Sequence, residues 1–368
     1  MARKLLRQNI VKRMVPQMRK STIAVLALIA TLGGSAATAQ AAAITDPNIL
    51  PILLADYNVI VDGQFNSTSD TEGPVLIGGD LGPGTVSLNS KDVVLGSTAG
   101  TTAITGYGEV NVFANHTAPS NNANGNVFVG GPVAGTFGSA TSVTFNYAFP
   151  PGATTGDNAA TFQNNIWSKI TGFSTGLAGL TANSTFSAAG EFTPGASVGP
   201  GTPAIFDVTL AQLNAFAGTL SFEGCLAGAA AATPTPCDAV INVIGSGPFA
   251  QNFTFPTPLQ NTGLPNVIFN FENASSVKWG LHYFDASILA PFAVAGTNGS
   301  GPLIGNLVAS SVSASAPIGG ELHRPTFDCS DNLCTTTSVP EPGSLPLLGG
   351  ALASFAVLAS FAAIRRRG

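Results

Sequence analysis

The sequence predicts a mainly β protein, folded as a parallel β-solenoid with one flanking α-helix. Its composition is typical of strands and turns, because Gly, Ser, Thr, Asn and Val are frequent and only 9% of the residues are charged. Short apolar runs recur at regular intervals, with glycine-rich corners between them. An antiparallel β-sandwich also produces short, evenly spaced strands, and it remains the alternative.

The first set of apolar runs lies between residues 57 and 147. Their centres step by about 16–18 residues, and Gly, Asn, Ser and Pro separate them. A hairpin dipeptide, Asn124-Gly125, occurs between two of the runs but not between every pair, which favours the solenoid. The five runs are Val75–Gly79, Val93–Gly96, Val110–Phe113, Val127–Gly131 and Val143–Asn146.

An amphipathic helix is predicted after Asp157, which is its candidate N-cap. Four apolar residues at spacings of four and three share one helix face: Phe162, Ile166, Ile170 and Phe173. Such a helix can cover an apolar flank of a solenoid. Residues 186–204 are rich in Gly, Pro and Ala and predict a loop. Strand-like runs then resume at Ile205–Val208, Leu220–Phe222, Ala239–Ile244, Val267–Phe271, Ser287–Ala290 and Leu307–Ala309.

The first 39 residues predict a cleavable secretory signal. Seven basic residues and no acidic residue lie within the first 20, and the apolar run Ile23–Leu32 follows. Small residues come next and include Ala37 and Ala39, the A-x-A pattern that signal peptidase cleaves. The apolar run is shorter than the roughly 20 residues that a membrane-spanning helix needs, which argues against a retained anchor.

The other end of the chain predicts a transmembrane tail, residues 345–368. Residues 345–364 carry no charge, and Arg365, Arg366 and Arg367 follow immediately. A helix of this length crosses a bilayer, with the arginines on the cytoplasmic side. A polar, proline-containing linker, residues 335–344, precedes the tail. The β domain is therefore expected over residues 40–334.

The region between the two targeting segments is strongly acidic. It holds four of the 14 basic residues and all 19 acidic ones, which gives a net charge of −15, against −5 for the whole chain. Such a surface repels nucleic acids and anionic lipids, so no nucleic-acid partner is expected. Acidity suits a protein that is soluble outside the cell.

The four cysteines form two close pairs, Cys225 with Cys237 and Cys329 with Cys334. In an exported protein, an even count and local pairing predict disulfides. A zinc site is the rival interpretation, but neither pair has C-x-x-C spacing.

Calcium is the one cofactor that the sequence suggests. Asp62, Asp70, Glu72 and Asp80 lie close together among glycines, and oxygen ligands on loops suit this ion. No EF-hand or nonapeptide repeat accompanies them.

No catalytic motif is present, and we predict that the chain is not an enzyme. The patterns G-x-S-x-G and H-E-x-x-H and the P-loop are absent. Glu321 and His323, two residues apart, face the same side of a strand, as a metal or acid–base pair would. We interpret them as a structural pair that closes the last coil. The other histidines are His116 and His282, and His282 lies near Asp285.

The last 30 residues resemble the PEP-CTERM sorting signal. Val339, Pro340, Glu341 and Pro342, an apolar span and the terminal arginines occur in the order that this signal requires. The resemblance implies recognition by an exosortase, a membrane peptidase, after transient insertion in the inner membrane. It also implies a Gram-negative host that makes extracellular polysaccharide, and delivery to the cell surface or the extracellular matrix.

Residues 52–327 resemble the choice-of-anchor A domain, which occurs on surface proteins and implies no enzymatic activity. The matching segments are Tyr57–Phe65, Asp70–Asp80, Val267–Phe271, Ser287–Pro291 and Gly320–His323. The closing pattern Ile-Leu-Ala-Pro, followed one coil later by Leu-Val-Ala, is similar to ice-binding-type β-solenoids with a flanking helix. We therefore expect a non-catalytic surface or matrix protein that is adhesive or associated with polysaccharide. A glycan-active β-helix enzyme and an ice-binding protein are the alternatives.

Overall fold

The structure, a computed structural model, shows a mainly β domain with parallel strands. It describes residues 49–84, 86–95, 107–117, 120–149, 155–199, 202–222, 238–256, 264–324 and 327. All of them belong to the second of the two units into which the chain divides, Asp46–Gly368. The prediction of a parallel β-solenoid is confirmed. The antiparallel β-sandwich is wrong, because every strand of the main sheet pairs in parallel with its neighbours.

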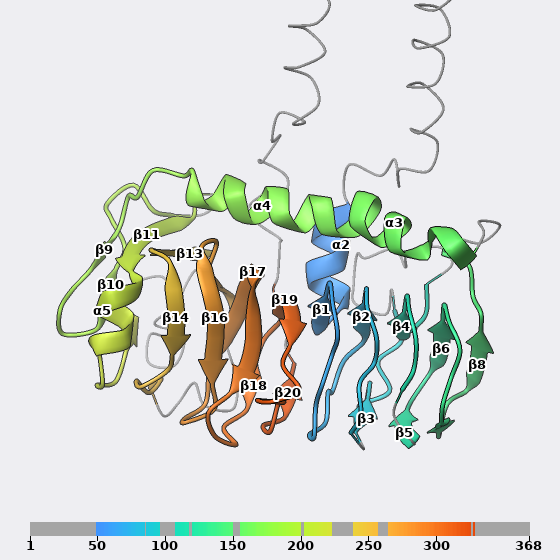
Figure 1. Ribbon diagram of the computed structural model, residues 1–368. Coiled ribbons are helices and arrows are strands. Elements are labelled where there is room, and N and C mark those ends of the chain that lie inside the picture. Colours follow the sequence, from blue (N-terminus) through green and yellow to red (C-terminus); the bar gives the residue numbers. More distant parts are fainter. Residues whose placement is uncertain are drawn as a thin grey trace, which may run out of the picture. The chain divides into compact units, whose positions relative to one another are not determined.

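One large sheet carries the fold, and its strands follow the order β11-β13-β15-β17-β19-β1-β2-β4-β6-β8 (Figure 1). The first half consists of β1 (Val59–Val61), β2 (Val75–Ile77), β4 (Val110–Val112), β6 (Asn126–Val129) and β8 (Ser142–Phe145). The second half consists of β11 (Ala204–Thr209), β13 (Ala239–Ile244), β15 (Leu264–Asn270), β17 (Ala286–Thr297) and β19 (Leu307–Val312).

The chain builds this sheet from the middle outward and then back toward the middle. Each coil from β1 to β8 adds a strand on one side, and the coils from β11 to β19 fill the other side. Val59 consequently lies opposite Val75 on one side and opposite Leu307 on the other. The first strand of the domain is therefore paired with both the second strand and the last long one.

Shorter strands form the other sides of the coils. Two of them, β14 (Gly247–Ala250) and β16 (Ala274–Trp279), extend the main sheet, because β17 pairs with β15 up to Leu289 and with β16 from Val294 onward. Three small sheets complete the coils: β3 (Ser87–Leu88), β5 (Ser120–Ala123) and β7 (Thr136–Gly138); β9 (Thr185–Phe186), β10 (Glu191–Thr193) and β12 (Ser221–Phe222); and β18 (Leu303–Ile304) with β20 (Leu322–His323).

Inward-facing side chains stack in columns through the coils. One column consists of Val59, Val75, Val110 and Val127, which lie opposite one another on successive strands and are fully buried. Burial of such a side chain contributes about 1.5–3 kcal/mol. Stacking of similar residues on successive coils explains the regular spacing of the apolar runs.

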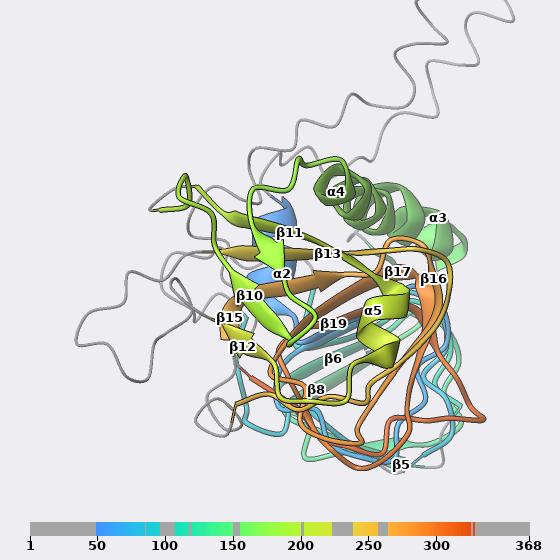
Figure 2. The ribbon, with the colours of Figure 1, turned by 90° about the vertical axis from the view of Figure 1, so that its left-hand side faces the viewer.

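The outer face of the main sheet is covered by a long helical segment (Figures 1 and 2). After a 3₁₀ turn, Thr155–Asp157, it runs through α3 (Asn158–Phe162), the π-helical turn Gln163–Trp167 and α4 (Ser168–Ala178). The predicted apolar face is confirmed, because Phe162, Ile166, Ile170 and Phe173 are all buried.

Buried amides attach this helix to the sheet. The Ser174 hydroxyl donates to Asn270 Oδ1 at 2.6 Å, and Asn242 Nδ2 donates to the Leu177 carbonyl at 2.8 Å. Asp157 occupies the N-cap position of α3, as predicted, but its side chain makes no capping hydrogen bond there.

Two short helices, α2 and α5, and two strands, β9 and β10, differ from the expectations. α2 (Ile49–Asp56) and α5 (Leu210–Ala215) were not predicted, although Thr209 and Gln212 form a capping box at α5. Residues 186–204 contain β9 and β10 rather than only a loop, because Phe192 packs against the sheet at 5.1 Å from Phe206.

The run Val93–Gly96 is not a strand over its described residues, 93–95. The strand of this coil is β3, and the chain turns directly after it with Asn89 and Asp92 at positive φ. The Asn89 side chain closes the turn, since it donates to the Val93 carbonyl and accepts from the Val93 N–H, both at 3.0 Å.

Several predictions concern residues outside the described ranges. They are the signal with Ala37 and Ala39, the four cysteines, the linker with its Pro-Glu-Pro segment, and the transmembrane tail with its arginines. Among the helices of the described residues, none is both long and apolar enough to cross a membrane.

Candidate functional site

The first and last coils meet at a polar junction beside β20. Leu322 forms a parallel bridge with Thr71, in which its N–H donates to the Asp70 carbonyl at 2.9 Å. The Glu72 N–H in turn donates to the Leu322 carbonyl at 2.9 Å. This backbone pairing places Glu72, from a loop of the first coil, next to His323 on the last strand.

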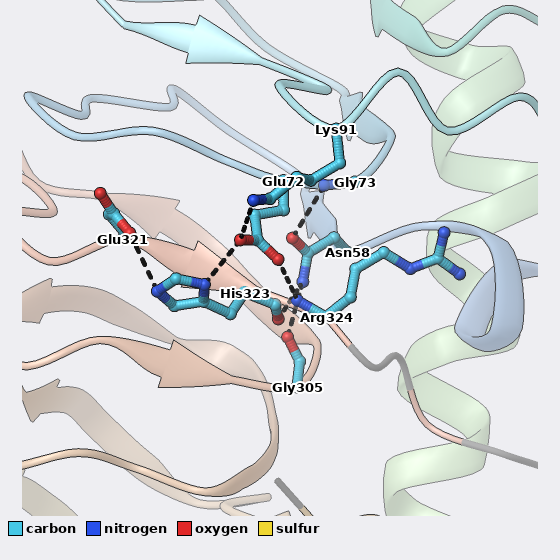
Figure 3. A network of polar contacts seen from close by, with 8 residues as sticks. All are labelled: Asn58, Glu72, Gly73, Lys91, Gly305, Glu321, His323 and Arg324. Carbon is cyan, nitrogen blue, oxygen red and sulfur yellow. Dashed lines mark hydrogen bonds and ion pairs between the residues drawn. The ribbon is translucent and has the colours of Figure 1, made fainter. Parts of the chain in front are cut away.

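The Glu72 carboxylate is the centre of the junction (Figure 3). Its Oε1 lies 2.7 Å from His323 Nδ1 and 3.5 Å from Lys91 Nζ, and its Oε2 accepts from the Arg324 backbone N–H at 3.1 Å. Burial alone raises the pKa of Glu72. The hydrogen bonds from Arg324 and His323 and the nearby positive charges outweigh burial and hold this pKa below its usual value. Glu72 is therefore an ionised carboxylate whose oxygens already have partners.

His323 lies between two carboxylates. Its Nε2 is 3.0 Å from Glu321 Oε2, so Glu321 and His323 do lie together, as their spacing predicts. The two ring nitrogens point in different directions, and Glu72 and Glu321 therefore lie at different edges of the ring (Figure 3). Because the three groups do not converge on one point, this arrangement favours a closing role over metal binding.

A buried amide, which the sequence interpretation missed, completes the junction. Asn58 Nδ2 donates to the Gly305 carbonyl at 2.7 Å and to the His323 carbonyl at 3.2 Å. Its Oδ1 accepts from the Gly73 N–H at 3.3 Å. Asn58 thereby binds backbone groups of both the first and the last coil, and the His323 carbonyl also accepts from the Gly305 N–H at 3.1 Å.

Asn306 has the same role where the chain enters and leaves the described domain. Its Nδ2 donates to the carbonyls of Leu54 and Tyr57 at 2.8 and 2.6 Å, and its Oδ1 accepts from the Phe327 N–H. Both asparagines come immediately before an apolar strand run, at Asn58-Val59 and Asn306-Leu307. An alignment of the coils with one another would have revealed this shared position.

The four calcium candidates have separate protein partners. Asp70 accepts from the Ser87 N–H at 3.0 Å, and Asp80 accepts from the Asn115 N–H at 2.9 Å. Asp62 accepts from the Gln163 side chain of the covering helix, and burial raises its pKa despite this bond. Glu72 belongs to the junction. Within the described part of the chain, no three His, Cys, Asp or Glu residues are grouped so as to hold a metal ion.

The remaining histidines do not assemble a catalytic group. His116 is buried inside the coils, stacks on Phe137 at 4.3 Å, and has its pKa lowered by burial. His282 is exposed, whereas Asp285 is fully buried and its carboxylate has no hydrogen-bond partner among the described residues. Burial raises the pKa of Asp285 to about 7. Asp285 therefore does not act on His282 despite their proximity in sequence.

The second half of the solenoid exposes apolar side chains on a paired strand. On β17, Phe292 is 53% exposed and Val294 is 39% exposed, while Ala293 and Ala295 between and beyond them are buried. Val294 lies opposite Ser276 of β16 and Ser311 of β19. We name the set of Ser276, Lys278, Phe292, Val294 and Ser311 the β17 strip. It combines short polar side chains with exposed apolar ones and carries a single charge.

The comparison with family models identifies the class of this domain. Residues 52–324 match the family described as "Putative Ice-binding-like adhesive domain". Because the match covers most of the chain, the chain belongs to this family. Neither the curated proteins nor the solved structures gave a match. The domain is thus an adhesive domain of the kind found at cell surfaces, and the resemblance to the choice-of-anchor A domain, over nearly the same residues, stays a prediction.

Proposed function

We propose that this protein is a non-catalytic adhesin that is exported to the cell surface or the extracellular matrix. The observation that carries the proposal is the β17 strip on a domain of an adhesive family. Phe292 and Val294 are exposed on the same face of one strand, where apolar side chains together offer a contact surface. The separate partners of the candidate carboxylates agree with a binding protein rather than a hydrolase, which needs two carboxylates facing one bond.

An extracellular polysaccharide is the partner that this strip fits best. The ring of Phe292 can pack on the apolar face of a sugar, and the hydroxyls of Ser276 and Ser311 can exchange hydrogen bonds with its hydroxyl groups. The strip has one positive charge, at Lys278, on a strongly acidic chain. A neutral or weakly charged glycan therefore fits better than a polyanion, which the rest of the domain would repel.

The adhesive contact is tested with the double substitution Phe292→Ala and Val294→Ser. We expect it to weaken retention on the polysaccharide of the native host by about thirtyfold or more, since two central apolar anchors contribute over about 1 kcal/mol each. The matched control is Val94→Ser, at a residue that is 55% exposed in the first half of the solenoid. Equal binding by both variants and the wild type would refute the proposed contact.

Two readouts of the same preparation separate the alternatives. New reducing ends released from the polysaccharide would show a glycan-active enzyme and end the non-catalytic proposal. Thermal hysteresis that is lost in the Phe292 and Val294 double variant would show that the β17 strip binds ice rather than a glycan.

Sorting is the second part of the proposal. Signal peptidase removes residues 1–39, the tail inserts transiently in the inner membrane, and an exosortase processes the chain near Pro340, Glu341 and Pro342. The order of these segments in the sequence supports it. Intact-mass analysis of fractionated native-host cells tests it. We expect an extracellular form that ends near residues 339–343, and a variant without the Pro-Glu-Pro segment that stays in the inner membrane. A complete tail in the inner membrane in both cases would contradict the proposal.

A further inference from the structure

The two ends of the solenoid are built differently. At the β11 end, β10, β12 and α5 lie in front of the main sheet (Figure 2). Phe206, an inward residue of β11, is fully buried, with the Phe192 ring of β10 at 5.1 Å. Phe192 in turn stacks on Phe222 of β12 at 4.8 Å. The small sheet of β9, β10 and β12 thus closes the interior at this end.

At the β8 end, the interior column is not closed. Phe145 lies opposite Val129, which lies opposite Val112, so all three belong to one inward column. Val112 and Val129 are fully buried, but Phe145 is 45% exposed. Val143, the inward neighbour of Val127, and Phe137 on β7 are also only partly buried. Beyond β8, Figure 1 shows no further strand or helix of the described residues on this side.

Among the described residues, the strand β8 itself carries no charge and no proline. Natural proteins protect an open strand edge with charges, a proline or a covering segment, because its free backbone groups can pair with another strand. No Asp, Glu, Lys or Arg occurs between Glu109 and Asp157, although the mature region carries a net charge of −15. The β8 edge is therefore the part of this acidic domain where a second acidic domain meets no charge repulsion.

We propose that the β8 end binds the β8 end of a second copy of this chain, across a twofold axis. A head-to-tail arrangement is excluded by the covered β11 end, which leaves the symmetric contact. Around the axis, β8 pairs antiparallel with β8 of the second copy. Interior residues must face interior residues. We place the twofold axis at Thr144, which meets this condition, so that Thr144 lies opposite Thr144 of the second copy and Val143 lies opposite Phe145.

The contact is small, and the dimer is therefore weak. One coil, residues 131–147, contributes about 17 residues per copy, fewer than the roughly 20–30 of a standard interface, so a dissociation constant on the order of micromolar is expected. Such a dimer presents two β17 strips, and simultaneous attachment increases retention on a repetitive surface. Dimerisation does not require that the proposed ligand is correct.

Sedimentation velocity of the full-length chain, over a concentration series around the micromolar range, tests this pairing. We expect the wild type to dimerise and Thr144→Lys and Thr144→Glu each to weaken dimerisation at least tenfold, because like charges would lie directly opposite each other. An equimolar mixture of the two variants should restore the dimer, since the charges then become complementary. Thr144 is exposed and points away from the interior, so neither substitution disturbs the coils.

The control is Ile244→Lys, at a 50% exposed residue on β13, which should leave dimerisation unchanged. A wild-type chain that stays monomeric throughout the series would overturn the proposal. So would a dimer that neither Thr144 variant weakens, or variants that stay monomeric when mixed. The last result would mean that the two Thr144 side chains do not lie opposite each other.

Discussion

Glu72 should stabilise the whole domain, although it lies in a loop, because it connects coils from opposite ends of the sequence. Glu72→Ala removes the bonds to the His323 ring and to the Arg324 N–H, at 2.7 and 3.1 Å. Each is a charge-assisted hydrogen bond to a partly buried carboxylate, worth about 1.5–3 kcal/mol when its loss leaves a partner unsatisfied. The contact with Lys91 adds little, since that side chain is 64% exposed.

We expect Glu72→Ala to lower the free energy of unfolding by about 2–4 kcal/mol, which is less than the sum of the two bonds because the His323 and Glu72 side chains are partly exposed to water. Lys91→Ala should lower it by less than about 0.5 kcal/mol. Urea unfolding followed by circular dichroism at pH 7 measures both. A double-mutant cycle with His323→Ala isolates the pairwise coupling, which should exceed about 1 kcal/mol.

The pH dependence of this effect follows from the lowered pKa of Glu72. A carboxylate with a folded pKa below its unfolded value stabilises the fold above the unfolded pKa and loses this contribution as the pH falls through the folded pKa. The difference between wild type and Glu72→Ala should be full at neutral pH and shrink in the acidic range. Equal destabilisation by the Glu72 and Lys91 variants, or a difference that grows on acidification, would refute the role of the junction.

Three further substitutions test the core and the covering helix. Gly78→Ala should destabilise the domain and loosen the helix, seen as faster hydrogen exchange around Phe162, because an added Cβ would lie 2.6 Å from the Phe162 ring. Ile288→Ala should cost about 2–5 kcal/mol in urea unfolding, since it leaves a cavity among fully buried side chains. Asp285→Asn should stabilise the domain at neutral pH, because the folded pKa of about 7 lies above the unfolded value. As the pH rises, Asp285 loses its proton in the unfolded state before it does so in the folded state, which destabilises the wild type. The advantage of Asp285→Asn should therefore grow between about pH 4 and 7, persist above this range and vanish below it.

The repetitive part of the fold was predictable because each coil contains a similar apolar run in its sequence. Val75, Val110 and Val127 stand at the start of similar runs, and stacking of these runs follows from their even spacing. The amphipathic helix was also predictable from a local pattern, because four apolar residues recur at spacings of four and three. The run at Val93 is misleading because its apolar pair is typical of a strand, whereas the Asn89 side chain binds the Val93 backbone groups in a turn.

The candidate sites depended on geometry that linear spacing does not contain. Asp62, Asp70, Glu72 and Asp80 are neighbours in sequence, yet each lies at a different point of a coil and meets a different partner. The short spacing of Glu321 and His323 did identify a contact, because both belong to one strand end. Their shared contact with Glu72 could not be read from the sequence, because it requires knowing which coil the last strand joins.

A repeat pattern does not predict that the last coil pairs with the first. This pairing determines which ends of the domain are free to bind other molecules. A simple solenoid would grow in one direction, with its first and last strands at opposite ends. Here β19 inserts beside β1, and Asn306 binds both the Leu54 carbonyl of α2 and the Phe327 N–H. The chain therefore enters and leaves the described domain at the same place, in the middle of the sheet. Neither the open β8 edge nor the covered β11 end has to carry a connection to the rest of the chain. An attached domain of this design can use one end for a second copy and the β17 strip for its ligand at the same time.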